Sequence, residues 1–182
     1  MNYQVIGECF VKEGEKLAQF LLNHEECNAS SLGRVYQHIK REKHDSFGII
    51  TAYRDANPPS KNKANFHQLK SNIRSLNLGF FVIQGIGQEE DGGESIEPSL
   101  FIPGITLKTL QKLMKKYKQY GVIYSGPETK GKIVLFTTEG KHDIGSFHPM
   151  KISQYFSKVK GKPFVFSHVE GNTHLERYAK SL

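Results

Sequence analysis

The sequence predicts an α+β fold in which helices pack on one antiparallel sheet, and three observations support this prediction. The 182 residues, 37% of them hydrophobic, are enough for one domain with a buried core. In the middle of the chain, short β-branched and aromatic runs alternate with segments of helical periodicity. Glycine and proline residues separate these segments. The chain has 2 cysteines, too few for a disulfide-built scaffold.

We expect residues 1–45 to form an N-terminal extension of this domain. The apolar residues over 3–11 predict a strand, and the spacing of apolar residues predicts a helix over 14–23. A second helix is expected after Ser30 and Ser31, because serine hydroxyls can cap the free N–H groups of a first helical turn.

The core is expected over residues 47–138, beginning with a buried strand over 47–53, where β-branched and aromatic residues are frequent. A polar loop with consecutive prolines follows, because proline interrupts regular structure. Apolar residues then recur at helical spacing over 66–78, and Gly79 follows as the residue that ends this helix.

Strands are predicted next over 80–86 and 96–102, on either side of an acidic, glycine-rich loop. A lysine-rich amphipathic helix is expected over 106–119, and two more strands over 122–125 and 132–138. The order of elements is therefore β-α-β-β-α-β with one added strand, which is the split βαβ, ferredoxin-like order. This order predicts an antiparallel sheet with both helices on one face.

The remaining residues, 139–182, are expected to form a C-terminal extension with a helix followed by a short strand over 163–166. The two extensions and the core would together make a single domain of residues 1–182. The face of the sheet that the core helices leave open needs a cover. The N-terminal helices, the C-terminal tail or another subunit could supply it.

The lysine-rich helix is a candidate polyanion-binding surface, because the chain has a formal net charge of +7. A charge run on a helix is usually a solvated face, and the alternative is an electrostatic footprint for nucleic acid or another polyanion. The chain has no zinc-finger or RNA-recognition signature, so sequence-specific binding is not predicted. The lysines that share one face of the predicted helix are Lys108, Lys112, Lys115 and Lys116.

Several kinds of catalytic and cofactor site are without support in the sequence. There is no P-loop, and the glycines within 85–87 lead into an acidic loop and a strand, not into the helix that a dinucleotide site requires. The 8 histidines lack the spacing of a helical metal site, and surface or structural roles are expected for them. No metal and no cofactor is predicted.

Polar residues gather where the predicted strands begin and end. Alternation puts Ser95, Glu97 and Ser99 on one face of their strand. A carboxylate in an apolar strand is either a surface residue or a partly buried group that holds a cation or a ligand hydroxyl. In the second case Glu97 is the candidate catalytic residue. Arg54 is likewise either a surface loop residue or a fork for a carboxylate. The candidate ligand-binding residues are Thr51, Tyr53, Arg54, Asn65, Ser95 and Ser99.

These segments resemble two groups of proteins, through residues 49–54 (IITAYR), 65–69 (NFHQL), 76–79 (LNLG) and 95–102 (SIEPSLFI). Over about residues 47–147 the chain looks like a small domain of unknown function found in bacteria and phages. It is also similar to the phage S-adenosylmethionine lyases, formerly called hydrolases. Those enzymes have a serine-aromatic-arginine strand end and a glutamate-bearing strand, without a proline after the glutamate.

The resemblance implies a nitrogen-regulator-type trimer with ligand sites between subunits. In the lyases, the carboxylate of the substrate attacks its own γ-carbon, and methylthioadenosine and homoserine lactone are the products. Catalysis then rests on proximity and orientation. Carried over to this chain, Glu97 would lie near the sulfonium or the ribose, and Arg54 would help to shape the pocket. Pro98 is a departure that brings the chain closer to the uncharacterised domain.

Three functions are therefore open: binding or cleavage of a nucleoside such as S-adenosylmethionine, a non-catalytic phage virion or host-interaction role, and nonspecific nucleic-acid binding. The expected partners are a small-molecule ligand, further copies of the chain, or a viral or host protein. No membrane partner is expected, because no segment approaches about 20 consecutive apolar residues. The N-terminus lacks the basic region of a signal peptide. We therefore expect a cytoplasmic location, in the host cytoplasm or the virion if the protein is phage-encoded.

Overall fold

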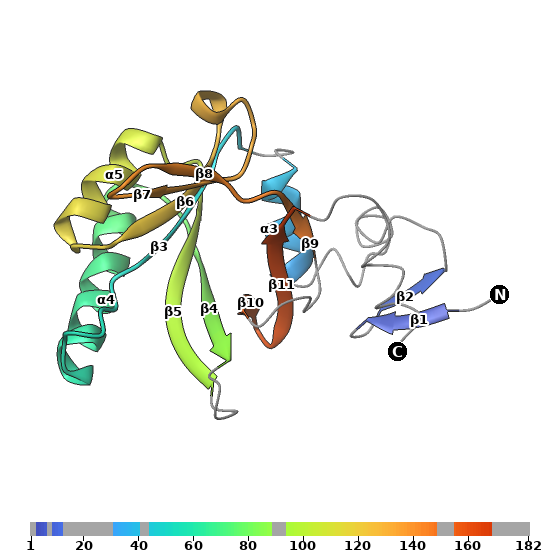
Figure 1. Ribbon diagram of the computed structural model, residues 1–182, viewed down its shortest axis with the longest axis horizontal. Helices are drawn as coiled ribbons and strands as arrows, with labels where there is room; N and C mark the ends of the chain where they lie inside the picture. Colours follow the sequence, from blue (N-terminus) through green and yellow to red (C-terminus); the bar gives the residue numbers. More distant parts are fainter. Residues whose placement is uncertain are drawn as a thin grey trace.

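The computed structural model describes residues 3–6, 9–12, 31–40, 44–88, 94–148 and 155–168 (Figure 1). None of the described helices is long and apolar enough to cross a membrane. The helices are α3 (Ser31–Ile39), α4 (Pro59–Ser75) and α5 (Leu107–Lys116), with a 3-10 turn η1 (Pro127–Thr129). The strands are β1 (Tyr3–Ile6), β2 (Cys9–Lys12), β3 (Phe47–Thr51), β4 (Phe81–Gln88), β5 (Glu94–Pro103), β6 (Gly121–Ser125), β7 (Val134–Thr137), β8 (Lys141–Asp143), β9 (Ser146–His148), β10 (Tyr155–Val159) and β11 (Lys162–Ser167).

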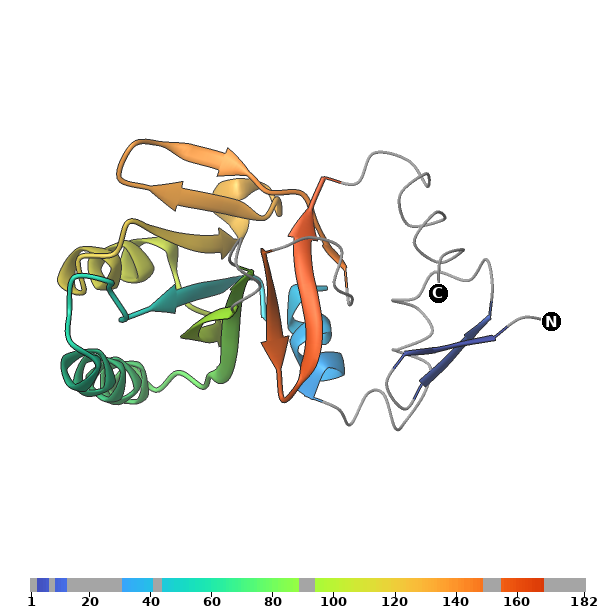
Figure 2. The same ribbon diagram turned by 60° about the horizontal axis from the view of Figure 1, so that its bottom comes forward.

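The main structural unit is a 9-stranded antiparallel sheet with the strand order β8-β7-β6-β3-β5-β4-β10-β11-β9. The sheet curls on itself and forms half of a barrel (Figure 2). β3 lies at its centre, paired with β5 on one side and with β6 on the other. Strands β1 and β2 form a separate two-stranded sheet.

The prediction of a ferredoxin-like fold class is wrong. The order of elements predicted for the core is present, as β3, α4, β4, β5, α5 and β6, but the sheet does not end with these strands. β10 pairs with β4, and β7 pairs with β6. Unpaired N–H and C=O groups on a sheet edge readily accept another strand, and the flanking segments of this chain supply those strands. The twist that accumulates over the extended sheet then curls it into a half barrel.

Helices α4 and α5 cover the face of the central strands that carries the larger hydrophobic core. Side chains alternate between the two faces of a strand, and Ile50, Leu100 and Ile102 point to this face and are fully buried. Thr106 caps the N-terminus of α5, and its Oγ1 accepts a hydrogen bond from the Thr109 N–H at 3.3 Å. The helix residues of this core are Phe66, Leu69, Ile73, Leu110, Leu113 and Met114.

The opposite, concave face is covered by α3 and by the curling C-terminal strands. Phe47 and Phe101 stack in the centre of the sheet with ring centroids 4.9 Å apart. Val35 of α3 and Phe164 of β11 are buried in the same cluster. The cover expected from the N-terminal helices, the tail or another subunit therefore comes from both extensions of this chain.

Several local predictions also differ from the structure. The strand predicted over 3–11 is instead a hairpin of β1 and β2. α4 begins at Pro59, inside the predicted loop, because proline is well suited to the first turn of a helix, where its missing N–H is not needed. The C-terminal extension contains strand β10 where a helix was expected around residue 155. The helix predicted over 14–23 lies outside the described residues.

The close approach of α5 to β3 leads to a first prediction, for Gly48→Ala. A Cβ at Gly48 would lie 2.7 Å from Leu110 Cδ2 and 2.8 Å from Ile105 Cγ2. Both neighbours are fully buried, so the extra methyl overpacks the core and should lower the free energy of unfolding by about 1–3 kcal/mol. Urea denaturation measures this change.

Gly79→Ala is the matched control, because a Cβ there meets no atom within 4 Å. Its free energy of unfolding should stay within about 0.5 kcal/mol of the wild-type value or rise slightly. Equal losses in the two variants would contradict the proposed packing of α5 on β3.

Candidate functional site

Thr51, Glu97 and Ser99 lie together on the concave face of the sheet, and we call these three residues the polar strip. Thr51 at the end of β3 is paired with Ser99 of β5, and Glu97 lies two residues before Ser99 on the same face. The next residue of β5 on this face is Phe101, which is fully buried in the cluster covered by α3. The polar strip therefore continues the aromatic cluster toward the end of β3, where the half-buried Thr51 and Ser99 replace apolar side chains.

Thr51 links the two strands through its side chain. Its hydroxyl donates its one proton either to the Pro98 carbonyl oxygen, 2.9 Å away, or to the Glu97 carboxyl group, and its Oγ1 accepts a hydrogen bond from the Tyr53 N–H at 3.0 Å. These contacts fix the hydroxyl at the strand end and place it beside the carboxylate.

The environment of Glu97 disfavours its ionised form. Partial burial of the carboxyl group raises the pKa of Glu97 above its usual range, and the negative charge of Asp55 acts in the same direction. The hydrogen bond with Thr51 acts the opposite way but does not cancel the rise. The residue as a whole is exposed, so the carboxyl group is partly desolvated and still accessible to a ligand.

The structure places Tyr53 and Asn65 away from the polar strip. Tyr53 packs against the core under α4, with its ring edge-to-face against Phe66 at 5.9 Å. Asn65 lies half-buried on α4 itself, and α4 covers the opposite face of the sheet. The side chain of Ser95 lies outside the described residues. Of the predicted ligand-binding residues, Thr51 and Ser99 are thus the two that the structure brings to Glu97.

Arg54 lies in the loop after β3, and its backbone N–H and C=O groups tie this loop to the side chain of Asn62. The Arg54 N–H donates to Asn62 Oδ1 and the Arg54 carbonyl accepts from Asn62 Nδ2, both at 3.0 Å. Asn62 is only 8% exposed, and its side-chain amide uses both its oxygen and its nitrogen to hydrogen-bond the loop backbone. No ion pair of Arg54 with a carboxylate is found among the described residues. Asn62 lies near the start of α4, and it was not among the predicted ligand-binding residues.

The predicted lysine face of α5 is solvent-exposed at all four positions, and α4 adds to it. Neither helix contains an aspartate or a glutamate. The two helices share one hydrophobic core, so their outer surfaces form a continuous carboxylate-free region. The cationic residues of this region are Lys61, Lys63, Lys70 and Arg74 on α4 and Lys108, Lys112, Lys115 and Lys116 on α5.

A second polar site was not predicted from the sequence. It lies between α3 and the segment that contains β8 and β9, and Lys132, Asp143 and His168 belong to it. His168 was expected to have a surface or structural role, and its link to Asp143 over 25 residues leaves no local sequence pattern. Within the described parts of the chain, no cluster of three or more His, Cys, Asp or Glu side chains could hold a metal ion.

The raised pKa of Glu97 predicts how Glu97→Gln changes stability with pH. A carboxyl group with a raised pKa binds its proton more tightly in the folded chain. The free energy of unfolding therefore falls as the pH rises from the ordinary carboxyl pKa through the raised one. The glutamine variant does not titrate, so its stability relative to wild type should increase between pH 4 and pH 7. Urea denaturation at both pH values measures this difference.

Glu139→Gln is the matched control, because Glu139 is exposed and lies far from the polar strip in the chain. Its stability relative to wild type should change less between the two pH values than that of Glu97→Gln. If Glu97→Gln instead loses stability relative to wild type as the pH rises, the ionised carboxylate stabilises the fold and our account of its environment is wrong.

Comparison with known proteins gives a family match for the middle of the chain. A family model described as "Protein of unknown function (DUF3293)" matches residues 54–122. This segment runs from the loop after β3 into β6, and it includes Glu97, Ser99 and the lysine face of α5 but not Thr51. No curated protein matches the chain. The chain is therefore similar to a domain of unknown function over residues 54–122, a shorter segment than the expected 47–147, and this match does not extend to the S-adenosylmethionine lyases.

Proposed function

We propose that the protein binds a small organic ligand at the polar strip. The observation that carries this proposal is the Glu97 carboxyl group, which remains accessible on a partly buried sheet face that raises its pKa. Ionisable groups held in an unfavourable environment are frequent at functional sites, because function and not stability retains them. The Thr51 and Ser99 hydroxyls beside it supply donors and acceptors.

The chemistry of the polar strip favours a ligand with a positive charge or with hydroxyl groups. A carboxylate accepts hydrogen bonds and pairs with cations, and partial desolvation strengthens both interactions. A sulfonium ion or the vicinal hydroxyls of a ribose would satisfy these requirements. S-adenosylmethionine carries both groups, so it is the first ligand to test.

The finer proposal is a lyase reaction, which is what the resemblance of the sequence segments to the S-adenosylmethionine lyases implies. The substrate's carboxylate oxygen would attack its γ-carbon, the bond from that carbon to the sulfonium sulfur would break, and the sulfur would keep the electron pair. Methylthioadenosine and homoserine lactone would leave. Glu97 would hold the sulfonium or the ribose, and Arg54 would help to shape the site. A trimeric assembly belongs to the same proposal, and a non-catalytic phage virion or host-interaction role is the alternative to it.

Isothermal calorimetry with S-adenosylmethionine tests the polar strip. The wild-type protein should bind, and Glu97→Gln should weaken binding about tenfold, the loss expected when a charge-assisted contact is removed. Glu139→Gln should bind like wild type. Chromatographic detection of methylthioadenosine tests the lyase step separately.

Two results would contradict this assignment. Absence of both binding heat and methylthioadenosine with the wild-type protein would exclude S-adenosylmethionine as the ligand. Equal affinity of wild type and Glu97→Gln would exclude Glu97 as a ligand contact. Circular dichroism melting of Glu97→Gln at neutral pH distinguishes a loss of binding from unfolding.

A second candidate function is nonspecific binding of nucleic acid or another polyanion by α4 and α5. The observation that favours it is the carboxylate-free outer surface of these two helices. Lysines at helical spacing along two neighbouring helices can contact successive phosphates of a polyanion. Such binding would depend strongly on salt, because it releases counterions from the nucleic acid.

Charge reversal at Lys112 or at Lys116 tests the helix surface. With a DNA duplex of arbitrary sequence, each of Lys112→Glu and Lys116→Glu should weaken binding and reduce the slope of log K against log salt by about 1. Lys141→Glu is the charge-matched control, because Lys141 is exposed on β8, an edge strand of the sheet, and not on α4 or α5. If all three variants weaken binding equally, net charge alone is responsible and the helix surface is not the site.

A further inference from the structure

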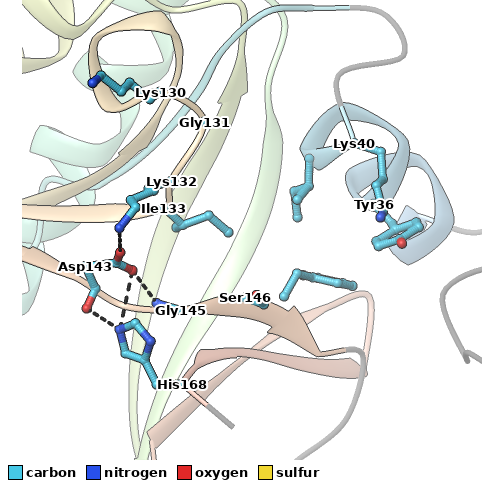
Figure 3. A pocket seen from close by; sticks show the side chains of 12 residues that line it. Tyr36, Lys40, Lys130, Gly131, Lys132, Ile133, Asp143, Gly145, Ser146 and His168 are labelled. Atoms are coloured by element: carbon cyan, nitrogen blue, oxygen red, sulfur yellow. Dashed lines mark hydrogen bonds and ion pairs between the residues drawn. The ribbon is translucent and has the colours of Figure 1, made fainter. Parts of the chain in front are cut away.

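A pocket of about 600 Å³ lies between α3 and the segments that surround β8 and β9 (Figure 3). Tyr36 and Lys40 border it from α3, and the loop before β7 and the turn between β8 and β9 border it from the other side (Figure 3). Its volume falls within the range of pockets that hold small organic ligands. It lies in a different part of the sheet from the polar strip, which is formed by β3 and β5.

The pocket lining is rich in positive charge. Lys40, Lys130 and Lys132 line it, and Asp143 is the one carboxylate among the described lining residues. Lys132 Nζ lies 3.0 Å from Asp143 Oδ2. Among the described residues, neither Lys40 nor Lys130 forms an ion pair. The lining therefore has two ammonium groups in excess of its carboxylate.

Asp143 is occupied within the wall of the pocket. Its Oδ1 accepts a hydrogen bond from the Gly145 N–H at 3.0 Å, and His168 Nε2 lies 2.7 Å from its carbonyl oxygen and 3.4 Å from Oδ1 (Figure 3). The hydrogen bonds from the Gly145 N–H and from Lys132 lower the pKa of Asp143. The carboxylate thus stays ionised and orients Lys132, and its oxygens have partners before any ligand arrives.

The turn that carries this wall is fixed by a close backbone contact. Gly145 has a φ of +82°, and a Cβ at this position would collide with the Ser167 carbonyl group. Only glycine fits both the positive φ and the close approach to β11. The wall formed by Asp143 and Gly145 is therefore held against β11 by the fold, which favours a preformed site.

The apolar lining residues define the second requirement of the ligand. Tyr36 and Phe147 lie with ring centroids 5.2 Å apart, Ile39 lies beside Tyr36 on α3, and Ile133 adds an apolar side chain from the loop before β7. No arginine is found among the described lining residues. Lysine ammonium groups act as point charges that suit the tetrahedral phosphate group, whereas planar carboxylates are better matched by the arginine fork.

We infer that this pocket binds a small organic phosphate whose phosphoryl group contacts Lys130 and Lys132 and whose apolar group packs near Tyr36 and Phe147. The juxtaposition that carries this inference is a lysine-bearing loop on one side of the pocket and an aromatic wall on the other (Figure 3). The inference is independent of ligand binding at the polar strip.

Isothermal calorimetry with three simple probes tests both halves of the site. Phenyl phosphate carries the phosphoryl and the apolar group, inorganic phosphate carries only the first, and phenol only the second. Phenyl phosphate should bind more tightly than either of the other two, and its affinity should fall as sodium chloride is added, because salt screens exposed charges.

Neutralised lysines identify where phenyl phosphate binds. Lys130→Gln and Lys132→Gln should each weaken its binding about fivefold or more at low ionic strength. Lys141→Gln removes the same charge from an exposed position that does not line the pocket, and it should bind like wild type. Circular dichroism melting confirms that each variant is folded.

Three outcomes would overturn the inference. Phenyl phosphate that binds no more tightly than inorganic phosphate would remove the role of the aromatic wall. Equal weakening in all three lysine variants would indicate a diffuse effect of net charge. Absence of phenyl phosphate binding by the folded wild-type protein at low salt would show that the pocket is not a phosphate site.

Discussion

The burial of strand β3 on both of its faces is the constraint on which the rest of the structure depends. Ile50 packs beneath α4 and α5, while Phe47 and Ile49 pack beneath α3 on the concave face. A strand whose two faces are both buried in hydrophobic cores belongs inside a sheet and not at its edge. Only there do the N–H and C=O groups on both of its sides find partners in neighbouring strands. β5 and β6 supply these hydrogen bonds, and the other strands extend the sheet outward from this arrangement. Gly48 completes it, because the absence of a side chain there lets Leu110 of α5 approach the strand.

The polar strip follows from the same strand. Thr51 is the last residue of β3 and shares its face with Ile49, but it lies where the cover provided by α3 ends and is half-buried. At this point the sheet face changes from aromatic to polar. A carboxyl group placed there is neither fully solvated nor fully enclosed, which accounts for the raised pKa of Glu97 and its accessibility.

Local patterns in the sequence predicted much of the central part of the fold. Strand alternation correctly put Glu97 and Ser99 on one face, and their proximity to Thr51 follows from the pairing of β3 with β5. The nine-stranded, curled sheet could not be predicted in the same way. It depends on which edges β7 and β10 join, and edge pairing between segments distant in the sequence leaves no periodic signal. Tyr53 and Asn65 were predicted as ligand-binding residues together with Thr51, but both lie away from the polar strip. The position of a side chain at a strand end depends on which elements cover each face of the sheet, and local patterns do not show this.

The distribution of charge separates the two candidate small-molecule sites. Glu97 lies near Asp55 and is a locally negative position in a chain with a net charge of +7, whereas the pocket beside α3 has more ammonium groups than carboxylates. Fields of opposite sign attract ligands of opposite charge. A cationic ligand would therefore be drawn to the polar strip and repelled from the pocket, and an organic phosphate would behave in the opposite way. The sites could then be occupied together without competition, because neither ligand satisfies the electrostatic requirement of the other site.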